Sequence, residues 1–126
     1  MRRFGPMAQE KRSPCPIACT LDMIGDKWTL LIIRDMFFGR TYFKDFGQSP
    51  EKIATNILSD RLAKLVEWGL AEKYIPDDGK GREAYRLTQR GKSLRPVLRA
   101  IAKWGLKEIE GTSAMVPSLN TSKVRD

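Results

Sequence analysis

The stretch SPEKIATNILSDRLAKLVEWGLAEKYIPDDGKGREAYRLT, residues 49–88, decides the fold. It begins with a capping serine, a proline at the first helical position and a glutamate near the positive end of the helix dipole. The pattern predicts a helix from Ser49 to Trp68. One face of this helix is apolar at helical spacing and is formed by Ala54, Leu58, Leu62, Leu65 and Gly69.

Two short strands and a last helix are predicted after this helix. Residues 70–75 and 83–88 flank the turn-rich segment PDDGKG, which is typical of a β-hairpin. Thr88 is placed to cap a helix that runs to about Glu110. Pro96 predicts a kink or a break in it, because proline lacks the amide hydrogen that a helix interior needs.

Upstream of residue 49 the sequence predicts three more helices. Residues 15–24 form the first, which Gly25 ends in the left-handed conformation that glycine adopts readily. Asp26 caps the second, which contains the run LLII, and Thr41 caps a short third helix, YFKDFG. A short helix, a tight connection, a longer helix and a hairpin follow one another in a winged helix-turn-helix. We therefore predict a mainly α-helical fold with a small β-hairpin, a winged helix-turn-helix.

Composition divides the chain into one domain and two flexible ends. A length of 126 residues suits a single domain. Residues 1–13 have no hydrophobic period, and residues 111–126 are rich in Gly, Ser, Thr and Pro. We expect both ends to be flexible and the winged helix-turn-helix with its terminal helices to occupy residues 14–110.

The charge balance and the absence of histidine reduce the number of possible functions. The chain has 23 Lys and Arg, 15 Asp and Glu, a net charge of +8, and no His. Without imidazole, His-based acid–base catalysis, Ser-His-Asp triads and His-containing zinc sites are excluded. Catalysis by paired carboxylates does not need His, but the acids here are scattered and lie at helix starts and ends, where capping explains them. We therefore expect no enzyme activity, no metal and no cofactor. A basic excess of this size favours double-stranded DNA or another nucleic acid as the partner.

The sequence favours a cytoplasmic protein without membrane attachment. Its longest apolar run, LLII at residues 30–33, is far shorter than the roughly 20 residues that cross a bilayer. No apolar segment follows Arg2 and Arg3, as a secretory signal requires. Two cysteines are too few for a disulfide framework. We expect a cytoplasmic, nucleoid-associated protein.

The helix face opposite the leucines carries small and amide side chains, where a solvated face more often carries long charged ones. An Asn pairs bidentately with adenine, a Ser contacts bases or phosphates, and a Lys reaches phosphate or guanine. We predict DNA contacts there from Ser49, Lys52, Asn56 and Ser59, with Thr55 at the flank of the face. The alternative is an ordinary exposed helix face.

Three basic residues complete the predicted DNA interface. Arg61 lies near the leucine side of the helix, so we interpret it as a structural or phosphate-pairing residue. Lys80 and Arg82, in the hairpin turn, are predicted phosphate contacts. The same turn contains Asp77 and Asp78, which a purely electrostatic clamp would not include.

The last helix carries an apolar stripe that is wider than a small domain easily covers by itself. The stripe is formed by Leu94, Val97, Leu98, Ile101, Trp104 and Ile109. A partner helix from a second copy would cover it, since two-fold dimers are the commonest oligomers. The alternative is a monomer that buries the stripe on its own domain.

Four segments occur together in a specific order, although each alone would be a weak signal: CPIACTLDMIGDKWTLLIIRDMFFG, YFKDF, ATNILSDRLAKLVEWGLAEK and YRLTQRGKSLRPVL. Over about residues 15–108 they resemble the HxlR-type winged-helix transcriptional regulators of bacteria. The resemblance implies a homodimer that pairs through its amino-terminal and last helices and presents two recognition helices to a palindromic site. The expected interface residues are Ile17, Leu21, Leu94, Leu98, Ile101 and Trp104.

The two cysteines leave three interpretations open. Cys15 occupies the Cys-Pro position where some members of the resembled family keep a redox-responsive thiol, and a helix start lowers a thiol pKa. Cys19 follows one helical turn later and departs from the family pattern. A soft-metal pair has too few ligands. The third interpretation is that both cysteines are small apolar fillers.

We therefore expect a homodimeric, sequence-specific DNA-binding transcriptional regulator, most simply a repressor, on a pseudo-palindromic operator. A winged-helix protein-interaction module is the alternative, because such folds also bind proteins. A thiol-based redox-sensing variant through Cys15 is the other alternative. The sequence leaves open whether a small-molecule or redox inducer exists.

Overall fold

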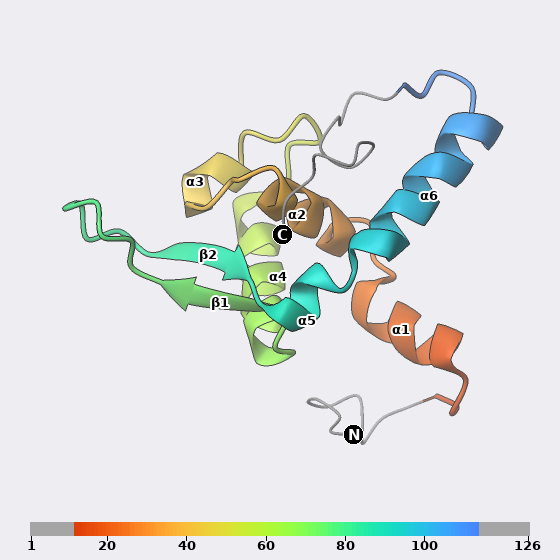
Figure 1. The fold of residues 1–126 in the computed structure, drawn as a ribbon, viewed down its shortest axis with the longest axis horizontal. Helices are drawn as coiled ribbons and strands as arrows, with labels where there is room; N and C mark the ends of the chain where they lie inside the picture. The colour runs from red at the N-terminus through yellow and green to blue at the C-terminus, as the bar shows by residue number, and fades with distance from the viewer. Residues whose placement is uncertain (1–11, 114–126) are drawn as a thin grey trace.

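Residues 12–113 are described by the computed structural model, and they fold as the predicted winged helix-turn-helix (Figure 1). Most of the two predicted flexible ends, at residues 1–11 and 114–126, lies outside the described residues. Within residues 12–113 no helix has the length and apolar character needed to cross a bilayer. In chain order the elements are α1 (Pro16–Ile24), α2 (Thr29–Phe37), α3 (Phe43–Phe46), α4 (Thr55–Glu67), β1 (Ala71–Tyr74), β2 (Ala84–Leu87), α5 (Gln89–Lys92) and α6 (Arg95–Glu108).

The hydrophobic core lies around α4, whose leucine face is buried as predicted. Leu58, Leu62 and Leu65 are at most 1% exposed. They belong to one core cluster with Ile33 of α2 and Phe46 of α3. Ala54 is exposed, because it is the N-cap residue before the first helical turn. The core therefore joins both helices of the helix-turn-helix to α2.

The strands β1 and β2 form the predicted antiparallel hairpin, with Tyr74 opposite Ala84. A short extra pairing joins this hairpin to the chain just before α3. Tyr42 forms an isolated β-bridge with Ala84, and the Tyr85 N–H donates to the Thr41 carbonyl at 2.8 Å. The hairpin is therefore anchored at the start of the helix-turn-helix as well as after α4.

The last helix is broken just before Pro96, which confirms the predicted kink or break. Thr88 caps α5, as predicted, by accepting a hydrogen bond from the Gly91 N–H at 3.1 Å. The second part, α6, begins at Arg95 and extends on the side of the molecule away from the hairpin tip (Figure 1). Gly91 lies against the chain before β1: a Cβ atom there would be 2.0 Å from the Leu70 carbonyl oxygen.

Two predicted helix ends are wrong. The expected start at Ser49 lies in a turn, and α4 begins only at Thr55, because Lys52 has a φ of 57° and cannot belong to a right-handed helix. Gly25 ends α1 but has a φ of −80°, so it does not take the left-handed conformation. Space requires a glycine there, since a Cβ atom would be 2.3 Å from the Leu21 carbonyl oxygen.

Asp26 joins the start of α2 to α4. Its carboxylate accepts the N–H groups of Trp28 at 3.0 Å and Thr29 at 3.1 Å, so it binds the amides at the start of α2, although Trp28 and not Asp26 is the N-cap residue. The same carboxylate accepts a hydrogen bond from Arg61 Nε on α4 at 2.9 Å. Burial raises the pKa of Asp26, but hydrogen bonds from Thr29 and Arg61 outweigh burial and lower the pKa to about 2.

The variant Asp26→Asn is expected to lose acid-sensitive stability. A carboxyl group with a lowered folded-state pKa stabilises the fold above its unfolded pKa, and this contribution disappears as the pH falls through the folded pKa. For Asp26 the loss lies between 3.8, its ordinary pKa, and about 2. Urea unfolding should therefore show a less stable variant at about pH 7 and a shrinking difference from wild type across that window. Asp77→Asn, at an exposed position in the hairpin turn, is the control.

The variant Gly91→Ala is expected to destabilise the fold by about 1–3 kcal/mol, because its Cβ atom forces α5 away from the Leu70 carbonyl. Gly47→Ala is the matched control, since Gly47 also has a negative φ and its nearest contact would be 3.4 Å away. Its stability should stay within about 1 kcal/mol of wild type in the same urea unfolding measurement. Equal stability of the two variants would contradict the close approach.

Candidate nucleic-acid interface

The turn between α3 and α4 is held against α2 by charged groups. Arg34 of α2 donates from its two terminal nitrogens to the two carboxylate oxygens of Glu51, at 2.9 Å each, and from Nε to Asp35 at 3.0 Å. Asp35 is 3% exposed and accepts the Ser49 hydroxyl at 2.5 Å. The hydrogen bond to Glu51 raises the pKa of Arg34, and the same bond lowers the pKa of Glu51. The turn is therefore anchored by paired, fully charged groups.

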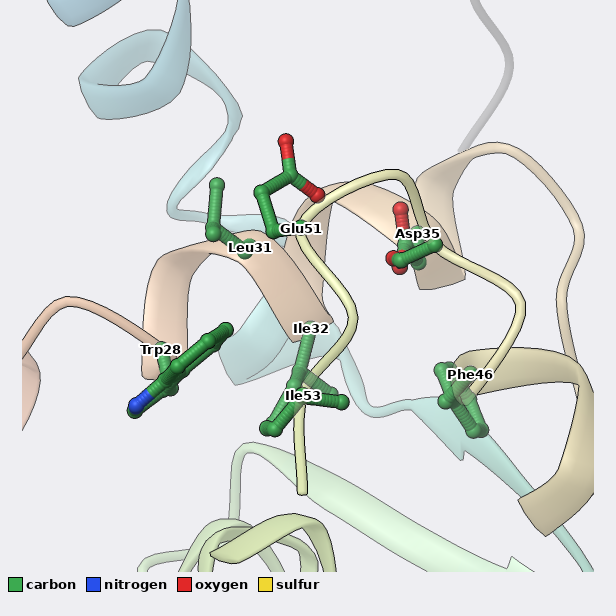
Figure 2. A pocket seen from close by; sticks show the side chains of 8 residues that line it. Trp28, Leu31, Ile32, Asp35, Phe46, Glu51 and Ile53 are labelled. Atoms are coloured by element: carbon green, nitrogen blue, oxygen red, sulfur yellow. The ribbon is translucent and has the colours of Figure 1, made fainter. Parts of the chain in front are cut away.

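Only a small cavity remains beneath this turn. Figure 2 shows Ile53 of the turn near Ile32 of α2, and Trp28 and Phe46 also line the space. The cavity measures about 10 Å³, which is room for about one water molecule. The turn is therefore packed directly onto α2, and this cavity is not a ligand site.

Three of the predicted DNA contacts lie on the outer side of α4. Thr55, Asn56 and Ser59 are exposed and belong to its first two turns. None of these side chains has a hydrogen bond to another residue in the described part of the chain. Lys52 is also exposed, but it lies in the turn before the helix and not on the helix. These four residues are called the recognition surface below.

Two other predicted contacts are used inside the protein. Ser49 is 5% exposed and its hydroxyl is bound to Asp35, so the prediction that it shares an exposed face with Asn56 is wrong. Arg61 donates to Asp26 from Nε and to Asp60 from Nη1 at 2.6 Å. Arg61 therefore ties α4 to α2, which is the structural role that its position on the helix indicated.

The hairpin tip is tied to the start of α3 by Tyr42. Its hydroxyl donates to Asp78, and the Arg82 guanidinium lies over its ring at 4.0 Å. Asp78 also accepts the Lys80 backbone N–H at 2.9 Å. These bonds explain an aspartate that a purely electrostatic clamp would not contain. Tyr42, and not Thr41, is the N-cap residue of α3.

The two predicted phosphate contacts in the hairpin differ in their surroundings. Lys80 is exposed, and its ammonium group forms no hydrogen bond or close ion pair within the range 12–113. Arg82 is half-buried and stacks on Tyr42. The Tyr42 hydrogen bond lowers the pKa of Asp78, which keeps this carboxylate charged beside Arg82. Lys80 is thus available to an anion, whereas Arg82 holds the hairpin in place.

Apolar side chains are exposed on α1 and α6, on the side of the molecule away from the hairpin tip (Figure 1). Leu98 is 7% exposed and belongs to the core, so it offers little surface to a partner. Leu94 is partly buried against the same core. The predicted interface residues that are exposed are Ile17, Leu21, Ile101 and Trp104.

The two cysteines lie at the start of α1. Cys15 is exposed and directly precedes the helix, whereas Cys19 is partly buried and its thiol donates to the Ser13 carbonyl at 3.3 Å. A redox-sensing Cys15 requires such exposure, and this role stays a prediction. Among the described residues no group of three or more His, Cys, Asp or Glu side chains is placed to hold a metal ion.

Comparisons with known proteins match this fold and one family. The HxlR-like helix-turn-helix family model matches residues 23–113. An HTH-type transcriptional regulator of Mycobacterium tuberculosis is 38% identical over 87 residues, which cover 68% of this chain and 53% of that protein. The HTH-type transcriptional regulator YdeP of Bacillus subtilis is 30% identical over 93 residues, which cover 74% of this chain and 73% of YdeP. The chain thus spans about half the length of the mycobacterial relative.

Solved structures show the same architecture. The structure of PA1607 superposes with a TM-score of 0.72 at 42% identity and covers 82% of this chain and 72% of that chain. The redox regulator HypR in its oxidized form has a TM-score of 0.68 at 27% identity and covers 76% of this chain and 99% of that chain. The family match spans α2 to α6 and thus the whole helix-turn-helix and hairpin. The chain therefore belongs to the HxlR-like helix-turn-helix family.

Proposed function

We propose that the chain is a sequence-specific DNA-binding transcription regulator. The recognition surface carries this proposal: its polar side chains are exposed at and just before the start of a helix whose leucine face is packed on the core. The second helix of a helix-turn-helix places its first residues against base edges in the major groove. The net charge of +8 and the HTH-type regulators among the relatives support an anionic partner of this kind.

Individual roles follow from the chemistry of each side chain. Asn56 and Ser59 are assigned to base edges, since an Asn amide pairs bidentately with adenine and a Ser hydroxyl bonds to several bases. Lys52, just before α4, is assigned to a phosphate or a guanine, and Thr55 to the flank of the same contact. Lys80 at the hairpin tip is assigned to a backbone phosphate. Phosphate contacts fix the position on DNA, and base contacts select the sequence.

We further propose that the chain acts as a homodimer joined through α1 and α6. Within residues 12–113, the apolar residues exposed on these helices are left uncovered by the rest of the fold. A two-fold dimer would bury this surface against its copy. It would also present two α4 helices to half-sites roughly 34 Å apart, as a pseudo-palindromic operator requires.

Fluorescence anisotropy of the full chain tests DNA recognition. A duplex from directly upstream of the gene is compared with a scrambled duplex at about 50 and 200 mM salt. Preference for the upstream duplex supports a sequence-specific regulator. Equal, strongly salt-dependent binding to both duplexes contradicts it. Absence of binding at low salt also contradicts it and favours a winged-helix protein-interaction module.

Two variants separate base reading from phosphate binding on the preferred duplex. Asn56→Ala is expected to relax the preference at one base pair by about 1–3 kcal/mol, because a bidentate contact is lost. Lys80→Ala is expected to weaken all duplexes alike and to reduce the slope of log K against log salt by about 1. Lys107→Ala, at an exposed position in the last turn of α6, is the control. An unchanged base preference for Asn56→Ala would contradict the assigned orientation of α4.

A second pair of variants tests the dimer by analytical ultracentrifugation. Trp104 on α6 and Ile75 next to the hairpin are both 63% exposed. Trp104→Glu is expected to sediment as a monomer, because it places a charge in the apolar interface. Ile75→Glu should remain dimeric like the wild type. A wild-type monomer, or dissociation by both variants, would contradict an interface on α1 and α6.

A further inference from the structure

A second, larger cavity lies among the end of α2, the residues after it, β2 and α5. Its volume is about 190 Å³. Four of the eight residues that line the cavity are apolar or aromatic: Met36, Phe37, Tyr85 and Leu87. The remaining wall contains three cationic residues and a threonine: Arg40, Thr41, Arg86 and Lys92. No Asp or Glu lines the cavity.

One of the three cations is already neutralised by the protein. Arg86 donates from Nε to Glu72 on the opposite strand at 2.7 Å. Its guanidinium also lies over the Tyr74 ring at 4.0 Å. Arg86 thus lines the cavity, but its charge is already paired with Glu72.

Arg40 and Lys92 form no such close ion pair, and the charge of Arg40 interacts with Glu51 only at longer range. Arg40 donates from Nη1 to the Asp45 carbonyl at 2.6 Å, which positions the guanidinium without neutralising it. Neither Arg40 nor Lys92 forms an ion pair with a carboxylate in the described part of the chain, and both are only partly exposed. Partly buried like charges without a close counter-ion cost free energy that a bound anion recovers.

Phe37, one of the rings that line the cavity, is itself held in place by a basic side chain. The Arg95 guanidinium, at the start of α6, lies over the Phe37 ring at 4.7 Å. The Phe37 ring thus lines the cavity and also stacks against the Arg95 guanidinium. The cavity therefore combines apolar walls with a positive potential, which suits an anion that has an apolar body.

We infer that this cavity binds a small, single-ring aromatic carboxylate. A cavity of about 150 Å³ in another protein holds benzene, so about 190 Å³ accommodates one ring and its carboxylate. Phe37 and Tyr85 provide contacts for the ring. Arg40 and Lys92 provide charge-assisted hydrogen bonds for the carboxylate. A neutral aromatic ring would form no ion pair with Arg40 or Lys92. A small anion without a ring would leave the apolar walls exposed to water.

This site shares no residue with the recognition surface, so ligand binding can be measured in the absence of DNA. A bound carboxylate would bridge Arg40, which precedes α3, and Lys92 of α5. These two residues lie on opposite sides of the hairpin in the sequence. An effect of the ligand on operator binding would rest on the proposed function. The binding test therefore contains no DNA, so that failure of one proposal is distinguishable from failure of the other.

The test is a titration of the ¹⁵N-labelled full chain with benzoate at constant ionic strength, followed by two-dimensional NMR. Saturable shifts are expected for the backbone amides of Arg40, Tyr85 and Lys92. Benzamide lacks the charge and acetate lacks the ring, so each should bind at least about tenfold more weakly than benzoate. The spectra also show directly that each variant is folded.

Matched lysine variants complete the test. Lys92→Gln is expected to bind benzoate about tenfold more weakly, because a charge-assisted hydrogen bond is lost, whereas Lys92→Arg retains binding. Lys107→Gln, in the last turn of α6, should bind like wild type. The inference is overturned if no shift saturates, if the shifts are confined to α1 and α6, if benzamide binds as well as benzoate, or if Lys92→Gln has no effect.

Discussion

The guanidinium of Arg34 is the group on which the arrangement of α3 and α4 depends, since it binds both Asp35 and Glu51 in a place where its own side chain is only 13% exposed. Charges are tolerated in such a place only when they are paired and hydrogen-bonded. Ser49 completes the arrangement by donating to Asp35. These bonds hold the turn between α3 and α4, which is not helical. They also hold Lys52 in its left-handed conformation.

Packing and polar bonds contribute differently to the placement of α4. Each buried leucine of its inner face is worth about 1.5–3 kcal/mol, so the leucines dominate the energy that keeps the helix on the core. The Asp26–Arg61 pair is partly exposed and is worth about 1 kcal/mol or less. This pair adds a directional hydrogen bond between α4 and the residues before α2. Tyr42 does the same for the hairpin, through Asp78 and Arg82.

The sequence predicts the elements that local chemistry governs. The hairpin around PDDGKG, the Thr88 cap and the break at Pro96 depend on residues within a few positions of each other. The start of α4 could not be predicted in this way, because Arg34 and Asp35 bind Glu51 and Ser49 from a distant helix. Periodicity marked Leu98 as apolar but cannot distinguish a core from a partner. The role of Tyr42 in holding the hairpin could not be predicted either, since Asp78 and Arg82 are distant from it in the sequence.

The recognition surface has a consequence for how regulators of this kind diverge. Asn56 and Ser59 bond to no other described side chain, whereas the nearby Arg61 is committed to the scaffold. Exchanging an exposed side chain of this sort changes stability by only about 0.5 kcal/mol. With the proposed role of these residues in base reading, two copies that arise by gene duplication would acquire different operators through a few substitutions, without a period of impaired folding. Natural selection would then act on target choice and on foldability almost independently in this helix.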